Sequence, residues 1–264
     1  MIEAAVEKAW RQMLSDRLGL SYSEHSPVLN TAIQRLCRLF DMTASEALDV
    51  LQLCGDDDPM WQRARDEVVV SSSRFFRDPE MYATVEQWLS ARAVDDILTA
   101  ISYGSADGRE AYSLAMLFSE AACPFAIIGV DISPRALEQA NQAHYSLRDI
   151  DEIPTGLQAK YTRSVADNRF TLVPKIRDAV RFFDPAALSS EEPLCADLIC
   201  CQNTLMYLTR EQQMSHLQWF EEHLNPGGLL LLSPTDQPQW RGRGLQRYAS
   251  PRVRALHKPM EDAA

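Results

Sequence analysis

The pattern that most constrains the fold is a regular alternation of short apolar segments with helical segments, which begins near residue 97. Such alternation predicts a parallel sheet covered by helices on both faces. In a doubly wound sheet of this kind, ligands bind at the carboxyl ends of the strands. The expected strands are 97–102, 126–130, 196–201 and 229–232, and the expected helices are 110–118, 134–143 and the segment after Thr209.

The first seventy residues have a different pattern, with apolar residues at helical spacing and no strand-like segments. Thr43 and Glu46 form a capping-box sequence before one of these helices. We therefore expect a helical N-terminal domain at 1–70, a linker and linking helix at 71–90, and an α/β domain at 91–264. Residues 154–183 fit the alternation less well and predict a small inserted β-subdomain of short antiparallel strands.

Charge and composition exclude several classes of function. The net charge of −11 argues against a nucleic-acid partner and against binding to anionic lipid, because a polyanion needs a basic surface. No apolar run is long enough to span a membrane, and Glu3 and Glu7 are atypical of a signal peptide. The six cysteines form no ligand cluster with the five histidines, so we expect no metal site. The sequence predicts a cytoplasmic protein without membrane insertion.

The first expected strand is followed by a turn that contains Gly104 and Gly108, and then by Glu110. The glycines allow a tight turn and a close approach of the backbone to a ligand. This is not the G-x-G-x-x-G pyrophosphate pattern, and an acid at the start of the next helix favours a cationic ligand over a phosphate. The alternative is that Glu110 only complements the helix dipole.

Two further strand ends carry polar side chains. Asp131 ends the second strand, where an acid can accept both hydroxyls of a ribose, or can instead cap the helix that starts near Pro134. Asn203 and Tyr207 follow the strand 196–201. They are expected near the same pocket, although a turn asparagine and a packing tyrosine are common alternatives.

Five motifs in order resemble those of CheR-type chemoreceptor glutamate methyltransferases. The segment 72–79 (SSRFFRDP) is similar to the family's T-x-F-F-R-E/D-P, and 108–116 (GREAYSLAM) is similar to G-E-E-P-Y-S-L-A-M. The segment 129–138 (GVDISPRALE), the segment 201–208 (CQNTLMYL) and the L-x-P-G-G at 224–228 continue the match. The resemblance implies an α/β, doubly wound, Rossmann-like methyltransferase sheet with a small helical N-terminal domain and a small inserted β-subdomain.

The resemblance also implies that the chain transfers a methyl group from S-adenosylmethionine to glutamate side chains of a chemoreceptor in chemotaxis or related signalling, leaving S-adenosylhomocysteine. Arg77 and Tyr207 would lie at the reaction centre. Glu110 would hold the amino group of the cofactor, and Asp131 would hold its ribose. The other positions that correspond to cofactor-binding residues are Ser71, Ser73, Arg77, Gly104, Asn203 and Thr204.

The sequence departs from the family's pattern at Ser71, Arg109 and Gln202, which stand where an asparagine, a glutamate and an arginine are usual. The family's cofactor segment near 180–188 has no clear register, since either Asp184 or Ala186 could occupy it. These departures leave open a regulatory protein of the same fold that binds S-adenosylmethionine or S-adenosylhomocysteine with little or no turnover. A methyltransferase acting on a small molecule or a nucleic acid is a further alternative, which the acidic charge and the Phe-Phe-Arg sequence disfavour.

The expected partner is the cytoplasmic helical region of a chemoreceptor-like protein. Family members that dock on a receptor's C-terminal pentapeptide have a glycine-rich loop in the inserted subdomain, whereas 161–183 contains no glycine and includes Pro174. We therefore predict recognition that does not depend on the pentapeptide. Arg35 and Arg38 could face acidic receptor helices or could belong to an ordinary solvated surface.

Overall fold

The computed structural model describes residues 2–92, 97–189, 194–234, 240, 242–248 and 253–260. The chain divides into two compact units. One unit combines Met1–Ser71 with Met206–Ser215, and the other combines Ser72–Leu205 with His216–Ala264. We call them the helical unit and the sheet unit, and each is described by itself. No helix among the described residues is both long and apolar enough to cross a membrane.

The helical unit packs four helices around two buried tryptophans, Trp10 and Trp61. The predicted capping box is present, because the side chain of Thr43 accepts from the backbone of Glu46 and the Glu46 carboxylate accepts from the backbone N–H of Thr43. The helices are α1 (Ala4–Leu18), α2 (Pro27–Phe40), α3 (Ala44–Leu53) and α4 (Pro59–Val68).

The segment 206–215 joins this unit through backbone hydrogen bonds. The N–H of Ser21 donates to the carbonyl of Tyr207 at 2.8 Å, and the N–H of Thr209 donates to the carbonyl of Gly19 at 2.7 Å. The Tyr207 ring packs against the apolar core of the helical unit. A short 3-10 turn, η3 (Leu205–Tyr207), leads into this segment.

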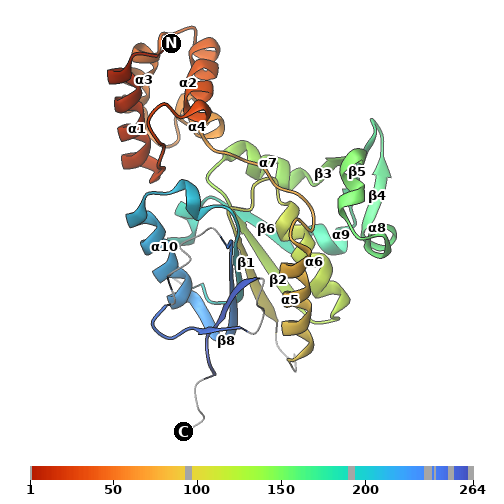
Figure 1. Cartoon of the computed structure of the whole chain (residues 1–264). Coiled ribbons are helices and arrows are strands. Elements are labelled where there is room, and N and C mark those ends of the chain that lie inside the picture. Colours follow the sequence, from red (N-terminus) through yellow and green to blue (C-terminus); the bar gives the residue numbers. More distant parts are fainter. Residues whose placement is uncertain are drawn as a thin grey trace. The chain divides into compact units, whose positions relative to one another are not determined.

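The sheet unit is built on a seven-stranded sheet of order β6-β2-β1-β7-β8-β10-β9 (Figure 1). The chain starts in the middle at β1, winds out through β2 to β6, and then returns to build the other half, in which β10 is antiparallel to β8. The predicted doubly wound sheet is confirmed, with its switch point between β1 and β7. The strands are β1 (Leu98–Tyr103), β2 (Phe125–Val130), β6 (Val180–Phe183), β7 (Ala196–Cys201), β8 (Leu224–Leu232), β9 (Gln246–Arg247) and β10 (Arg254–His257).

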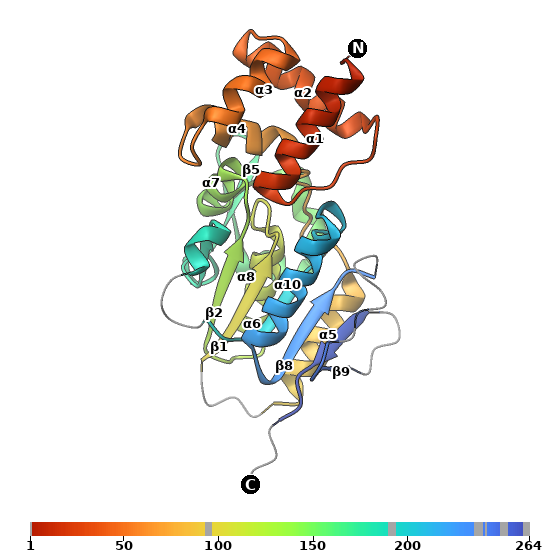
Figure 2. The same ribbon diagram turned by 90° about the vertical axis from the view of Figure 1, so that its left-hand side faces the viewer.

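Helices cover both faces of this sheet. Figures 1 and 2 show α5 (Pro79–Ser90) and α6 (Arg109–Glu120) on one face and, on the other, the part of α10 (Arg210–His223) that belongs to the sheet unit. The strands between them are apolar, because they are covered on both faces. The remaining connections on the β2–β6 side are α7 (Pro134–Gln142) and the 3-10 turn η2 (Pro185–Ser189).

A second, three-stranded antiparallel sheet of order β3-β5-β4 is inserted between α7 and β6. We call residues 144–177 the insert, and Figure 1 shows it on the same side of the main sheet as α6. Its elements are β3 (His144–Ser146), η1 (Leu147–Glu152), α8 (Thr155–Tyr161), β4 (Thr162–Val165), β5 (Arg169–Leu172) and α9 (Pro174–Arg177).

The insert differs from the predicted range of 154–183 at both ends. It begins earlier, with β3, and the strand at 180–183 belongs to the main sheet, where it runs parallel to β2. The physical reason is packing against Gly129, where an added Cβ would lie 2.3 Å from the ring of Phe182. Pro174 begins α9 rather than lying in a strand, so it gives no argument about strand pairing.

Candidate active site

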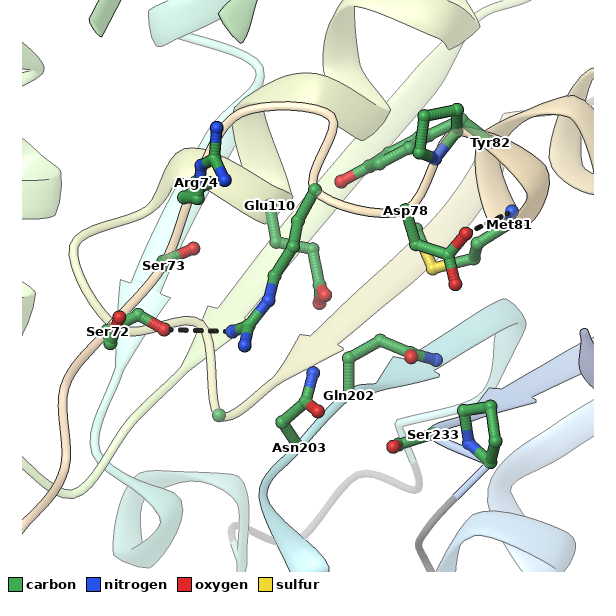
Figure 3. Close-up of a pocket in the computed structure, with 14 residues that line it drawn as sticks. Ser72, Ser73, Arg74, Asp78, Met81, Tyr82, Glu110, Gln202, Asn203 and Ser233 are labelled. Atoms are coloured by element: carbon green, nitrogen blue, oxygen red, sulfur yellow. Dashed lines mark hydrogen bonds between the residues drawn. The ribbon is translucent and has the colours of Figure 1, made fainter.

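A pocket of about 290 Å³ opens at the carboxyl ends of β1, β7 and β8, beside the switch point of the sheet. Figure 3 shows its side chains converging from the segment before α5, from the start of α6, and from the residues that follow β7 and β8. The lining residues are Ser72, Ser73, Arg74, Arg77, Asp78, Pro79, Met81, Tyr82, Gly104, Glu110, Gln202, Asn203, Ser233 and Pro234.

The glycine turn after β1 forms one wall of the pocket. Gly104 has a φ of +80°, and the N–H groups of Gly104 and Ser105 both donate to the carbonyl of Val130. A Cβ added at Gly104 would lie 2.0 Å from the hydroxyl of Thr204. Thr204 donates in turn to the carbonyl of Gln202 at 3.2 Å. Thr204 therefore packs behind the turn and is not among the residues that line the pocket.

Glu110 lies in the first turn of α6 and presents a partly buried carboxylate to the pocket. The hydroxyl of Ser102 donates to its Oε1 at 2.7 Å. Burial raises the pKa of Glu110, while hydrogen bonds from Ser102 and Cys200 and the charge of Arg77 oppose that shift. A carboxylate held in this way gains from any cation that enters the pocket.

The segment between α4 and α5 forms the opposite wall. The guanidinium of Arg77 donates to the carbonyl of Ser72 at 3.2 Å, and this hydrogen bond joins two residues that line the pocket. Phe76 has a positive φ of 47°, and its N–H donates to the hydroxyl of Ser113. Asp78 caps α5, because its carboxylate accepts from the backbone N–H groups of Glu80 and Met81.

Asp131 follows β2 and is 7% exposed. Its two carboxylate oxygens accept from the N–H of Ala106 at 2.8 Å and from the N–H of Ser133 at 2.9 Å. The cap of the following helix is Ser133, whose side chain accepts from Ala136. Asp131 therefore ties the end of β2 to the glycine turn, and its role toward a ribose stays a prediction because it is not among the lining residues.

The pocket brings together five of the predicted site residues, which are Ser73, Arg77, Gly104, Glu110 and Asn203. The roles assigned to them stay predictions. The other predicted residues lie elsewhere. Ser71 is exposed and belongs to the helical unit, as does Tyr207, while Thr204 and Asp131 support the glycine turn.

Sequence reasoning missed several lining residues. Gln202 was noted only as a departure, yet its buried Nε2 lines this pocket without a hydrogen-bond partner among the described residues. Ser233, which follows β8, also lines the pocket and was not assigned to the site. Met81 and Tyr82 lie one turn after the cap Asp78, so the helical period from that cap was the signal that could have located them.

The comparisons with known proteins cover the same part of the chain. Residues 71–239 match the family model described as CheR methyltransferase, SAM binding domain. A chemotaxis protein methyltransferase of Listeria monocytogenes is 28% identical over 176 residues, which cover 64% of this chain and 66% of that protein. A probable biofilm formation methyltransferase WspC of Pseudomonas putida is 28% identical over 249 residues, which cover 87% and 56% respectively. The chain thus spans less than two thirds of the length of either relative.

Solved structures align less closely. A SAM-dependent methyltransferase from Thiobacillus denitrificans in complex with S-adenosyl-L-homocysteine is 16% identical, with a TM-score of 0.36, covering 62% of this chain and 50% of that one. The assignment therefore rests on the strand order and on the family model, which matches more than half of the chain. The chain belongs to the CheR methyltransferase family, and residues 71–239 are its SAM-binding domain.

Proposed function

We propose that the chain is a cytoplasmic S-adenosylmethionine-dependent methyltransferase that modifies glutamate carboxylates of a chemoreceptor-type protein. The observation that carries this proposal is that a partly buried acid, Glu110, and a guanidinium, Arg77, line the same pocket of the family's SAM-binding domain. The acid suits the cationic cofactor and the guanidinium suits an anionic acceptor. Neither of these two interactions uses a metal ion. Among the described residues, no three His, Cys, Asp or Glu side chains lie where they could hold one together.

The residues present fit the cofactor that the family implies. Glu110 would hold the ammonium group, because a partly buried carboxylate with a raised pKa is stabilised by a nearby cation. The buried Nε2 of Gln202 would donate to an acceptor atom of the ligand. Asp131 accepts from two backbone N–H groups at the carboxyl end of β2, and the resemblance assigns it the ribose hydroxyls.

S-adenosylmethionine supplies a methyl group on a sulfonium, and the acceptor carboxylate is already a nucleophile at neutral pH. No general base is required, so the protein contributes orientation and exclusion of water. A guanidinium carries five N–H donors, and the bond from Arg77 to Ser72 does not exhaust them. Arg77 would therefore align the acceptor carboxylate beside the methyl group. We assign Tyr207 a role in substrate contact on the resemblance alone.

Recognition of the receptor would not depend on a C-terminal pentapeptide. The hairpin between β4 and β5 turns through Asp167 and Asn168, both with positive φ, and contains no glycine-rich loop. This compact turn supports a partner surface other than the one that tethered family members use. Direct titration with an aromatic receptor-tail peptide checks this. Micromolar binding that is lost when 161–183 is altered would contradict it.

A cofactor-binding regulatory protein with little turnover remains the alternative. Of the three departures that support this alternative, only Gln202 lines the pocket, at a position where the family has an arginine. Arg109, the other main departure, bonds to the carbonyl of Ser73 and to Asp149. The substitution at Arg109 therefore gives no reason to expect a failed pocket.

The decisive experiment is transfer of a labelled methyl group to the cytoplasmic fragment of a candidate chemoreceptor. We expect base-labile methyl esters on glutamates with the wild type, and a much lower rate with Arg77→Ala at unchanged stability. Arg163→Ala, which removes an exposed arginine of the β4 edge, is the matched control. Tight cofactor binding without transfer to any receptor fragment would favour the regulatory protein, and full transfer by Arg77→Ala would remove the assigned role of Arg77.

A further inference from the structure

The pocket segment Ser72–Asp78 lies between α4 and α5 and is itself neither helix nor strand, so it lacks the regular backbone hydrogen bonds of those elements. Its backbone groups must therefore be satisfied by side chains or by water. Two of them are bonded from within or beside the pocket, because Arg77 donates to the carbonyl of Ser72 and Ser113 accepts from the N–H of Phe76. Two others are bonded by Arg109 and by Glu152 of the insert.

Arg109 is the first residue of α6 and contacts the pocket segment, the insert and the glycine turn. Its guanidinium donates to the carbonyl of Ser73 at 2.9 Å and to the carboxylate of Asp149 in the insert at 2.7 Å. Its Nε lies 3.4 Å from the carboxylate of Asp107 in the glycine turn. The Arg109 side chain is only 18% exposed, so water screens these contacts less than it would on an open surface.

Glu152 of the insert binds the same segment one residue further along. Its two carboxylate oxygens accept from the N–H of Phe75 at 2.9 Å and from the Nε of Arg74 at 3.0 Å. The ring of Phe75 is fully buried and packs edge-on against Tyr145 of β3, with centroids 4.8 Å apart. Phe170 of β5 also packs against the Phe75 ring, and the two ring centroids are 5.9 Å apart.

The insert also contacts the other wall of the pocket. The hydroxyl of Tyr145 donates to the carbonyl of Asp107 at 2.8 Å, so one residue of β3 touches both the glycine turn and Phe75. The guanidinium carbon of Arg109 lies over the Tyr145 ring, 5.4 Å from the ring centroid. The insert therefore bears on both pocket walls, although none of its residues is among those that line the pocket.

We propose that Arg109 and Glu152 are positioning residues that hold the pocket segment Ser72–Asp78 in its binding conformation, so that the insert sets the affinity of the pocket for the cofactor. This inference rests on the pocket being the cofactor pocket of the proposed function. The side chains of Ser73 and Arg77 face the ligand from a backbone that Arg109 and Glu152 fix from outside. Releasing either anchor lets the segment sample other conformations, and binding must then bear the cost of ordering it.

A matched control exists at the opposite end of α6. Lys160 of α8 lies 2.6 Å from Glu120, the last residue of that helix, and the Tyr161 hydroxyl also contacts Glu120. This ion pair joins the same insert to the same helix, but α6 places it about 16 Å from Arg109 at the usual rise per residue. Its loss should loosen the insert without releasing the pocket segment.

The test is calorimetric titration of S-adenosylhomocysteine into the full chain. We expect Arg109→Ala and Glu152→Gln each to weaken binding about tenfold, and Lys160→Ala to change it less than twofold. Arg109→Lys keeps the charge but cannot bridge Ser73 and Asp149 with a planar fork, so we expect an intermediate loss. Wild-type affinity in both pocket-side variants, or an equal loss with Lys160→Ala, would overturn the proposal.

A second measurement separates this inference from the proposed function. Hydrogen exchange of the amides of Phe75 and Phe76 in the ligand-free protein should be faster in Arg109→Ala, which removes neither amide's own acceptor, and unchanged in Lys160→Ala. Unchanged exchange in Arg109→Ala would contradict the anchoring. A wild-type protein that binds no S-adenosylhomocysteine would contradict the proposed function, and the exchange result would still decide the role of Arg109.

Discussion

An acid follows each of β1 and β2, a partly buried Glu110 and a buried Asp131, but the two acids are held in opposite ways. Asp131 after β2 accepts from two backbone N–H groups, of Ala106 and Ser133. Glu110 after β1 accepts from the hydroxyl of Ser102, and burial raises its pKa. One carboxylate completes the local backbone, whereas the other lies in a pocket and accepts from no backbone N–H among the described residues.

This difference indicates that neighbouring strand ends of a doubly wound sheet can have different roles, one structural and one in ligand binding. Backbone amides stabilise the charged form of Asp131 without any ligand, so Asp131 shapes the glycine turn at all times. The charge of Glu110 is costly until a cation arrives, so Glu110 favours an occupied pocket. Loss of Asp131 should therefore cost stability and binding together, whereas loss of the Glu110 charge should cost binding alone.

The largest effect should come from Gly104→Ala, at the turn that lies between the two acids. The alanine would need a positive φ, and its Cβ would overlap the Thr204 hydroxyl. We expect a loss of about 3 kcal/mol in the free energy of unfolding, measured by chemical denaturation, with cofactor binding abolished.

Gly156→Ala is the control, because nothing lies within 4 Å of a Cβ added there and the residue is in helix α8. Adding Thr204→Gly to Gly104→Ala should recover part of the lost stability, since it removes the atoms in the way. A fully stable Gly104→Ala protein that binds the cofactor would show that the turn is not the rigid wall described above.

Asp131→Ala should give the next largest effect. It leaves the N–H groups of Ala106 and Ser133 without their acceptor, so we expect a loss of about 2 kcal/mol in stability. Calorimetry with S-adenosylhomocysteine should show a further loss of about 1.5–3 kcal/mol in binding free energy from the ribose contact. Reduced stability with unchanged affinity would mean that Asp131 only supports the turn.

Glu110→Gln should weaken cofactor binding by about 1.5 kcal/mol, roughly tenfold, because the amide keeps the shape of the acid but loses its charge. The same variant should be at least as stable as the wild type, since a carboxylate disfavoured by burial has been removed. Equal affinity of the two proteins for S-adenosylhomocysteine would assign Glu110 to the helix dipole.

The smallest expected effect is the pH dependence of that stability difference. The raised pKa of Glu110 means that folding favours its protonated form. Its contribution to the ligand-free protein is therefore fully present below its ordinary pKa of 4.5 and is lost as the pH rises through the folded value. Denaturation of wild type and Glu110→Gln across this window should show the advantage of the variant growing with pH, and a constant difference would contradict the raised pKa.

The main sheet was predictable because its strands are apolar on both faces. The strand 196–201 was located to the residue, and β1 and β2 lay within one residue of the prediction. The start of the insert was not predictable in this way, because β3 has only Tyr145 buried between two exposed residues. Its three residues resemble the end of a helix until β5 pairs with them.

The pocket was predicted only in part. Gly104, Glu110 and Asn203 follow strands, so the topology of the sheet indicated them. The role of Arg109 was not visible, because its partners Ser73 and Asp149 are distant in sequence and meet it only in the folded chain. Tyr207 was assigned to the reaction centre from a motif, whereas its own contacts are with the helical unit.

The central claim is that the pocket at the ends of β1, β7 and β8 binds S-adenosylmethionine through Glu110. Calorimetric titration of S-adenosylhomocysteine into wild type and Glu110→Gln, side by side at neutral pH, tests it most directly. We expect saturable binding of one ligand per chain to the wild type and roughly tenfold weaker binding to the variant. No binding to a folded wild-type protein, or the same affinity in both, would contradict it.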